Sequence, residues 1–496
     1  MRKRLFGRLL LLSLICGLVT PAALSAPKSG PLNILWILAE DMGTDWGVYG
    51  EPESHTPNLN KLAKRGTRFT HVFTNTSICS TSRSSLYTGM YPTSIGAHHH
   101  RTMESVKKEL PDGVELLPHI LRKADYQTAL LTDLGDDKIK GSKKRDWNFK
   151  YNEPVYDTNS IDDLSASKPF FAHVQFPESH RGFGHAKQYI NVRADPNKVR
   201  IRPYYVDHPL VREDWADYLD NVSLFDQKVS FVIDQFKNRN LLKNTVIFIF
   251  SDHGRAQFRG KQWLYDSGVN IPFIVIWPKA HPLPKGYAVN SVSDQVISGI
   301  DITAQTLAIA GATLPPLMHG KPFLGNNRVI RKYAFSSRDR ADETADYIRT
   351  VRDKRFRYIR NYRPELPYSQ LNLYKETSYP ALRLMRGMAQ TGELNKAQAH
   401  FFQAKKPDHE LYDLNADPFE VNNLAYDPQY QHELLRLQAV LDNWELETND
   451  LGRLPEPKAA REFFARRIGT AMKNKIRKAK QDGSWTYRGK ISDSYQ

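Results

Sequence analysis

The chain has 496 residues, with 70 Lys and Arg against 54 Asp and Glu, and only two cysteines. At about 100 to 200 residues per domain, this length favours two or three domains with a well-buried core. A composition that is 40% hydrophobic, 25% charged and 11% aromatic excludes a disordered or collagen-like chain.

The first 26 residues have the order of a secretory signal peptide. An apolar run at 9–19 leads to small residues that end at Ala26, and it is preceded by four basic residues: Arg2, Lys3, Arg4 and Arg8. The run is too short to span a bilayer. We therefore expect removal of 1–26, export to the periplasm or out of the cell, and no transmembrane segment in the remaining chain.

Removal of the signal changes both the cysteine count and the charge. Cys16 leaves with the signal, so Cys79 remains alone and cannot form an internal disulfide. The same step removes four positive charges, so a formal net charge of +16 becomes +12. A basic exported protein should attract polyanions, which outside the cytoplasm are acidic polysaccharides rather than nucleic acid.

Part of this excess lies near the C-terminus. The segment 458–490 holds eleven Lys and Arg against Glu462 and Asp482. Two interpretations stay open: a solvated, partly helical extension, or a contact with the substrate or a surface.

Three short apolar runs end in acids or imidazoles. The run 32–38 leads to Glu40 and Asp41, the run 170–174 leads toward Glu178 and His180, and the run 246–250 leads to Asp252 and His253. Buried strands of a parallel sheet end in this way at a ligand crevice.

Helical patterns lie between these runs. Thr56 and Pro57 predict a helix start with Thr56 as N-cap, and Gly66 predicts its end. The apolar spacing from Trp215 to Phe236 predicts one long amphipathic helix. Strands that alternate with helices predict an α/β domain at 27–340, with helices on both faces of its sheet.

The pattern changes after residue 340. Alternating apolar and basic residues at 347–362 predict antiparallel strands, and 410–414 reads as another short strand. A turn at Asp417-Pro418 precedes a helical pattern at 429–446. We therefore expect a smaller α+β domain, built on an antiparallel sheet, at 341–452 and a basic extension at 453–496.

The remaining cysteine lies in a segment rich in hydroxyl groups, 76–85. This stretch could cap a helix that begins near Ser80, which would place Cys79 at the helix N-terminus, where free amides favour an anion. Arg83, one turn later, would direct its guanidinium group toward the same spot. The alternative is a buried structural cysteine on a core helix.

These motifs resemble those of the type I sulfatases. Cys-Ser-Thr-Ser-Arg at 79–83 and Leu-Tyr-Thr-Gly-Met-Tyr-Pro at 86–92 are similar to the segment in which that family oxidises a cysteine to formylglycine. The resemblance continues in family order through 33–41, 56–59, 251–254 and 410–418, and segments 96–101 and 335–340 are most similar to the heparan N-sulfatase-like branch. It implies an alkaline phosphatase-like fold with a large, mixed, mostly parallel sheet sandwiched by helices.

The resemblance also implies site residues. Ca²⁺, or alternatively Mg²⁺, would be held by hard ligands: Glu40, Asp41, Cys79 as formylglycine, Asp252 and His253. The catalytic group would be Cys79, Arg83, Lys144, His180 and Lys261. The substrate would contact His98, His100 and Arg340.

Two positions depart from the family pattern. Position 81 is Thr where the maturation motif commonly has Pro or Ala, and the usual Gly-Lys pair after Tyr126-Gln127-Thr128 is absent. We assign the second sulfate-site lysine to Lys144, with Lys143 as the alternative. Maturation would need a formylglycine-generating or anaerobic sulfatase-maturating enzyme.

The resemblance implies a sulfuric ester hydrolase whose formylglycine hydrate attacks sulfur, with His180 near the leaving atom. We expect a substrate that is a sulfated polysaccharide or oligosaccharide, carrying O-sulfates or N-sulfoglucosamine, and no nucleic acid partner. Two alternatives stay open: a phosphodiesterase or phosphonate monoester hydrolase of the same superfamily, and a catalytically silent protein that binds polyanions.

Overall fold

The computed structural model describes residues 30–165 and 167–481. The predicted signal peptide, 1–26, and the last part of the predicted extension, 482–496, lie outside the described residues. Contacts divide the chain after Pro31, and the following description concerns the unit that begins at Leu32.

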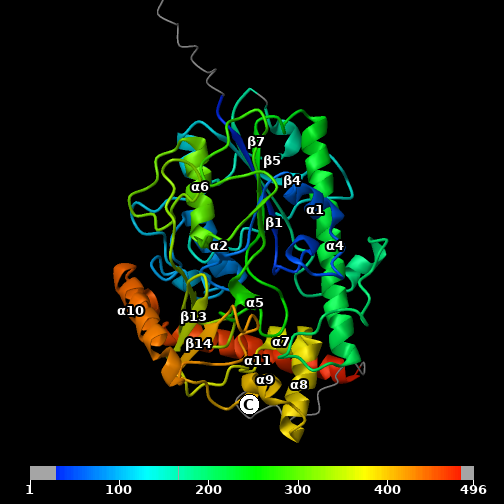
Figure 1. Ribbon diagram of the computed structural model, residues 1–496, viewed down its shortest axis with the longest axis vertical. Coiled ribbons are helices and arrows are strands. Elements are labelled where there is room, and N and C mark those ends of the chain that lie inside the picture. The colour runs from blue at the N-terminus through cyan, green and yellow to red at the C-terminus, as the bar shows by residue number, and fades with distance from the viewer. Residues whose placement is uncertain (1–29, 166, 482–496) are drawn as a thin grey trace, which may run out of the picture. The chain divides into compact units, whose positions relative to one another are not determined.

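An eight-stranded sheet forms the centre of this unit (Figure 1). Its strand order is β5-β4-β6-β1-β7-β8-β2-β9, and β8 runs antiparallel to both of its neighbours. The other paired strands are parallel, so the predicted mixed, mostly parallel sheet is confirmed. The strand bounds, in chain order, are β1 Asn33–Ala39, β2 Thr67–Phe69, β4 Gln127–Asp133, β5 Thr158–Ser160, β6 Phe170–Phe176, β7 Thr245–Ser251, β8 Phe273–Ile276 and β9 Ser291–Ser293. A separate pair is formed by β3 (Val72–Phe73) and β10 (Ile297–Ser298).

Helices cover both faces of the sheet (Figure 1). On one face, α1 (Pro57–Ala63) packs on the long α4 (Pro209–Asn238); on the other, α2 (Cys79–Thr88) and α3 (Leu117–Lys123) pack on α6 (Gly299–Ala310). Strand β1 contributes side chains to the apolar core on each face of the sheet, because successive side chains of a strand point to opposite faces. Leu35, Ile37 and Ala39 belong to the core under α4, and Ile34, Trp36 and Leu38 belong to the core under α6.

The helix at α1 begins as predicted, but its cap differs. Thr56 is the N-cap residue and Pro57 is the first helical residue, yet the Thr56 side chain makes no capping bond. Instead its hydroxyl oxygen accepts a hydrogen bond of 2.9 Å from the backbone N–H of Gly47. A tertiary contact has therefore taken the place of the local one.

A four-stranded antiparallel sheet follows, in the order β11-β12-β13-β14. Its strands are β11 Ala334–Arg338, β12 Ile348–Arg352, β13 Phe356–Asn361 and β14 His409–Asp413. The helix α10 (Gln431–Glu447) packs on it, with Trp444 stacked on Phe335 at a ring distance of 5.0 Å. The antiparallel strands expected at 347–362 and 410–414 are thus confirmed, and the first strand, β11, lies before the domain boundary that we expected at 341.

Five further α-helices are described. They are α5 Asp266–Val269, α7 Leu373–Ser378, α8 Pro380–Thr391, α9 Lys396–Ala399 and α11 Lys458–Gln481. Helix α11, which belongs to the predicted basic extension, packs against α7. None of the helices in the described part of the chain is both long and apolar enough to cross a bilayer.

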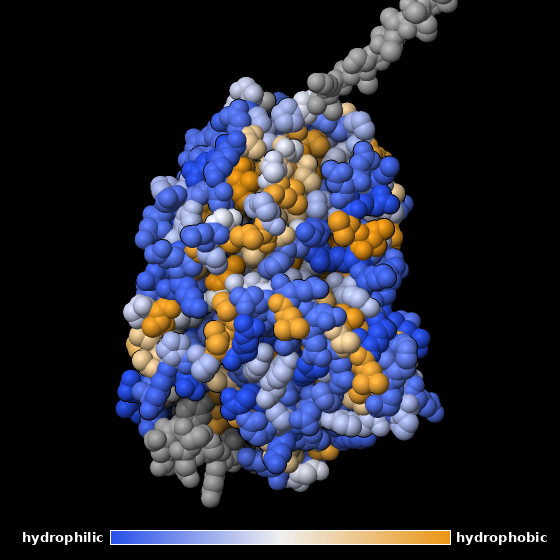
Figure 2. Space-filling model, turned by 90° about the vertical axis from the view of Figure 1, so that its left-hand side faces the viewer, coloured by the Kyte–Doolittle hydropathy of each residue, from blue (hydrophilic) through white to orange (hydrophobic). Residues whose placement is uncertain are grey.

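The surface is mainly polar on the face that Figure 2 shows, where apolar side chains form small, separate groups. Two large groups of buried apolar side chains pack against the two faces of the central sheet. The arrangement leaves the carboxyl ends of β6, β1 and β7 side by side, because these neighbours are parallel and in register at Phe176, Ala39 and Ser251.

Candidate active site

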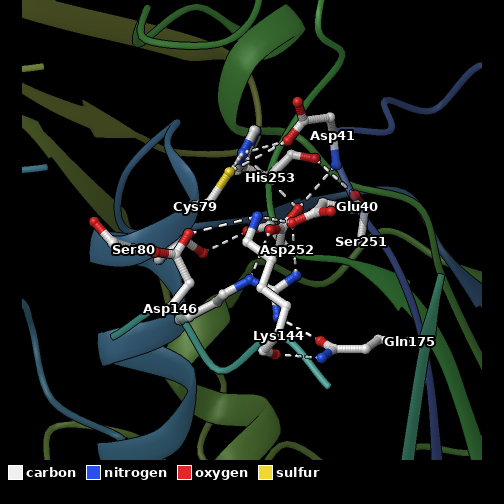
Figure 3. A network of polar contacts seen from close by, with 12 residues as sticks. Glu40, Asp41, Cys79, Ser80, Lys144, Asp146, Gln175, Ser251, Asp252 and His253 are labelled. Atoms are coloured by element: carbon white, nitrogen blue, oxygen red, sulfur yellow. Dashed lines mark hydrogen bonds and ion pairs between the residues drawn. The ribbon is translucent and has the colours of Figure 1, made fainter. Parts of the chain in front are cut away.

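Cys79 is the first residue of α2 and is fully buried. The predicted placement at a helix N-terminus is confirmed, although the preceding residue, Ile78, makes no side-chain cap. The sulfur lies 3.5 Å from Asp41 Oδ1, 3.3 Å from His253 Nε2 and 3.2 Å from Lys261 Nζ. Figure 3 shows Asp41 and His253 converging on it. Cys79 therefore lies among charged groups and not in an apolar core.

Asp41 and Asp252 follow the adjacent strands β1 and β7. The backbone N–H of Asp41 donates to Asp252 Oδ1 over 3.0 Å, and the N–H of Asp252 donates to the Ala39 carbonyl over 3.1 Å. Asp41 has a φ of 57°, in the left-handed region that aspartate tolerates better than most side chains. This backbone turn lets the chain leave β1 while the carboxylate stays beside Cys79.

Two cationic groups face Asp41. Lys261 Nζ lies 2.6 Å from Asp41 Oδ2, and His253 Nε2 lies 2.9 Å from Asp41 Oδ1. The other ring nitrogen, Nδ1, lies 2.9 Å from the Gly254 carbonyl. Because a carbonyl only accepts, Nδ1 carries a proton, and the orientation of the ring is fixed.

Arg83 links the ends of three neighbouring strands. Its Nε lies 3.2 Å from Asp252 Oδ2, and its Nη2 lies 3.3 Å from Glu40 Oε1. Its Nη1 donates to Gln175 Oε1, at the end of β6. The guanidinium group was expected to turn toward Cys79, but its donors are directed at these acceptors, which hold it rigidly beside the site.

Glu40 and Lys144 form the edge of this cluster. Lys144 Nζ forms an ion pair with Glu40 Oε1 and lies 3.4 Å from Asp146 Oδ2 (Figure 3). Lys143 instead lines a separate groove beside β4 and β5. Of the two lysines that the sequence offered, Lys144 is thus the one at the site.

The charges shift each other's ionisation. Burial would raise the pKa of Asp41, yet Lys261 and His253 hold that pKa well below its usual range. The pKa of Asp252 is also lowered, since His253 and Arg83 outweigh its burial. Burial would lower the pKa of His253, but the nearby Asp252 and Asp41 raise it to about 10. Two anionic carboxylates therefore meet an imidazolium ion.

The same residues fit a divalent cation. Asp41, Cys79, Asp252 and His253 each offer one ligand atom, and these four atoms lie within 4.8 Å of one another. Two buried carboxylates suit a hard cation such as Ca²⁺ or Mg²⁺, and the His253 proton is the positive charge that such an ion would replace. Glu40 is outside this group of four, because its carboxylate pairs with Arg83 and Lys144.

His180 lies beside the entrance to the site. A cleft of about 480 Å³ is lined, among others, by Glu40, Arg101, Lys144, His180, Arg181 and His185. Asp41 raises the pKa of His180, but burial and Lys261 lower it further, so the pKa is below 6.5 overall. His180 is therefore near the cluster, and no hydrogen bond joins it to Cys79 among the described residues.

The three residues expected to contact substrate take different positions. His100 Nδ1 lies 2.8 Å from Ser80 Oγ, next to Cys79, and its Nε2 lies 3.6 Å from Asp342 Oδ1. Arg340 pairs with Glu456 at 2.6 Å and donates to the His100 carbonyl at 2.9 Å. His98 is buried; in the part of the chain that the structure describes, no contact joins it to the Cys79 cluster, and its pKa falls to about 4 through burial and Arg349.

Sequence reasoning missed Gln175, Asp146 and Arg101. Gln175 is a buried polar residue in the otherwise apolar end of β6, which is the signal that could have revealed it. Asp146 contacts both Lys144 and Arg101, at 3.4 Å and 3.3 Å. These contacts join residues that no local pattern connects.

Comparisons with known proteins agree with this geometry. The sulfatase family model matches residues 32–312. An ulvan-active sulfatase of Formosa agariphila is 33% identical over 472 residues, which cover 86% of this chain and 76% of that protein. Human N-sulphoglucosamine sulphohydrolase is 26% identical over 487 residues, covering 85% of this chain and 91% of that protein.

Solved structures share the fold. A 2-O GAG sulfatase matches with a TM-score of 0.60 and 18% identity, covering 87% of this chain and 96% of that one. A phosphonate monoester hydrolase from Silicibacter pomeroyi matches with a TM-score of 0.59 and 16% identity, covering 84% and 96%. Similarity at this identity establishes the fold, whereas the family rests on the sequence match over more than half of the chain. The chain belongs to the sulfatase family.

Proposed function

We propose that this sulfatase removes sulfate from a sulfated polysaccharide or oligosaccharide. The observation that carries the proposal is the position of Cys79, whose sulfur lies between Asp41, His253 and Lys261 at the N-terminus of α2. An anionic ester needs this combination, with positive groups for the sulfate and a nucleophile beside them. The two relatives reported above, named for ulvan and for N-sulphoglucosamine, support a carbohydrate substrate with O-sulfate or N-sulfate groups.

The nucleophile in this proposal is formylglycine, produced from Cys79 by a formylglycine-generating or anaerobic sulfatase-maturating enzyme. A divalent cation, Ca²⁺ or Mg²⁺, would be held by Asp41, Asp252, His253 and residue 79, with Glu40 as a further ligand if it leaves its ion pairs. When bound, the cation would polarise the sulfate oxygens, and formylglycine would supply the attacking oxygen.

The other residues bind and orient. Lys261, beside Cys79 and Asp41, and Lys144, beside Glu40, neutralise the sulfate. Arg83 fixes Glu40 and Asp252 relative to each other. His180 donates a proton to the leaving oxygen or nitrogen as the sulfur bond breaks.

The cleft at the entrance to the site carries positive charge, which suits an anionic substrate. Arg101, Lys144, Arg181 and two histidines line the cleft, against Glu40 and Glu178. A basic cleft raises the local concentration of an anionic substrate. We further propose that the chain is exported after loss of 1–26, which would bring it to such polymers; nucleic acid is not a partner in this proposal.

A second candidate is hydrolysis of phosphonate monoesters or phosphodiesters, which the structural match to a phosphonate monoester hydrolase favours. Matured protein loaded with Ca²⁺ should be assayed with 4-nitrophenyl sulfate, a sulfated oligosaccharide and bis(4-nitrophenyl) phosphate. We expect a higher kcat/KM on the sulfate compounds. A strong preference for the phosphodiester would contradict the proposal.

The third possibility, a silent protein that binds polyanions, is tested in the same assay. Sulfate release from the oligosaccharide, followed by ion chromatography, distinguishes turnover from binding. Tight binding without release by matured, metal-loaded protein would favour the silent protein.

A further inference from the structure

Helix α7 brings a tyrosine to the active site from the C-terminal part of the chain. The Tyr374 ring lies 5.3 Å from Lys261 Nζ, and its centroid lies 5.8 Å from the centroid of the His180 ring. Tyr374 thus lies between the lysine that faces Cys79 and the histidine at the cleft.

The hydroxyl group of Tyr374 is, with those of Tyr368 and Tyr379, one of three tyrosine hydroxyls without a partner among the described residues of this region. It is buried, and no hydrogen-bond partner meets it among the described residues. A desolvated hydroxyl normally finds a partner, since leaving it unpaired is unfavourable. An oxygen or nitrogen of a bound substrate would supply the missing acceptor.

The hydroxyl also keeps the proton that a hydrogen-bond donor needs. Burial raises the pKa of Tyr374 to about 12, even though Lys261 lowers it. The pKa of His180 shifts the other way, below 6.5. At neutral pH the Tyr374 hydroxyl is therefore protonated, whereas the neighbouring His180 ring is neutral.

Resting on the proposed sulfatase function, we infer that Tyr374 is a further catalytic residue, whose O–H donates a hydrogen bond to the bridging atom of the sulfate group. That atom is the oxygen of an ester or the nitrogen of a sulfamate. It gains negative charge as its bond to sulfur breaks, so a donor at this position stabilises the transition state more than the bound substrate. No proton needs to leave the tyrosine, and His180 remains the group that transfers one, in its protonated form.

The test uses leaving groups of different basicity. Matured, metal-loaded wild type and Tyr374→Phe are assayed with 4-nitrophenyl, phenyl and 4-methoxyphenyl sulfate. A poorer leaving group carries more charge in the transition state and depends more on a donor. We expect kcat to fall by about 10- to 100-fold on the poorest leaving group but by less than about threefold on 4-nitrophenyl sulfate, with little change in KM.

Tyr368→Phe is the matched control. Tyr368 is another buried tyrosine of the same region, and it packs on Phe401 at a ring distance of 4.8 Å instead of facing Lys261. Its variant should keep the wild-type dependence on the leaving group. Tyr374→Gln, which restores an N–H donor, should recover part of the lost rate on phenyl sulfate, and melting temperatures identify any variant that is misfolded.

The outcomes separate this inference from the function on which it rests. The role of Tyr374 alone is overturned if the wild type hydrolyses the series and Tyr374→Phe either loses the same factor of rate on every leaving group or loses no rate at all. A matured wild type that hydrolyses no sulfate ester overturns the sulfatase proposal and this inference together.

Discussion

The ammonium group of Lys261 lies 3.2 Å from the sulfur of Cys79, although 182 positions separate the two residues. The same group lies 2.6 Å from Asp41. One buried lysine thus contacts both the residue proposed as nucleophile and an acid proposed to hold the metal. A sulfate oxygen bound by this lysine would therefore lie beside the proposed nucleophile.

Replacing Lys261 with Met should remove this sulfate contact. We expect kcat/KM for 4-nitrophenyl sulfate to fall by about 100- to 1,000-fold, as for the loss of one charged donor at a transition state. Lys279→Met, at an exposed position, is the control and should keep the wild-type value. A Lys261→Met enzyme within a few-fold of wild type would show that the lysine serves the fold and not the substrate.

Removing the cation should stop turnover. Dialysis against a chelator should abolish sulfate release, and added Ca²⁺ should restore it, because Asp41, Asp252 and His253 lie together as a ligand set. Asp252→Asn should lower kcat by about 1,000-fold or more and weaken Ca²⁺ binding in calorimetry. Asparagine is the informative replacement, since alanine would remove the Asp252 partner of the buried Arg83 and leave it only Glu40 and Gln175. Asp234→Asn, on the surface of α4, is the control and should change neither kcat nor Ca²⁺ binding. Full activity of the wild type in chelator would refute the metal assignment.

Arg83→Lys should destabilise the protein as well as inactivate it. Arginine donates to Asp252, Glu40 and Gln175 at once, and the single ammonium of lysine cannot reach all three. We expect the free energy of unfolding, measured with denaturant, to fall by about 2 to 4 kcal/mol. Arg453→Lys, on the surface, should be neutral, and an equal loss in both variants would mean that the network adds nothing specific.

The activity should depend on pH through His180. Its pKa is lowered from 6.5, so the protonated donor is present at low pH and disappears as the pH rises through that lowered value. We therefore expect kcat/KM for phenyl sulfate to fall with a midpoint below pH 6.5. His180→Gln should remove this dependence together with most of the rate, whereas His185→Gln, at the outer part of the cleft, should keep it. An unchanged profile in His180→Gln would assign the proton to another group.

The sequence could predict the parts of the fold and site that rest on local patterns. Hydrophobic runs and motifs only a few residues long predict that Cys79 lies at the start of α2. They also predict that Asp41 and Asp252 lie just after parallel strands. The order of the eight strands was not predictable in this way, since β8 reverses direction through contacts distant in sequence.

The remaining residues depend on packing between distant segments. Gln175 meets Arg83 across 92 positions, and Tyr374 reaches Lys261 from a short helix with no recognisable motif. The hydroxyl groups around Cys79 were expected to cap α2, but no side chain caps it. Several of these groups bond to other parts of the site instead: Ser82 donates to the Asp252 carbonyl, and Ser80 lies against His100. A capping pattern cannot reveal that competition.

The most direct test of the central claim is the mass of the peptide that contains residue 79. Protein co-expressed with a maturation enzyme should be digested and examined by mass spectrometry beside a Cys79→Ser variant. Conversion of Cys79 to formylglycine predicts a peptide about 18 Da lighter than the thiol form, in proportion to the specific activity of each preparation. A peptide with an intact thiol, in protein that releases sulfate from its substrate at full rate, would contradict the account.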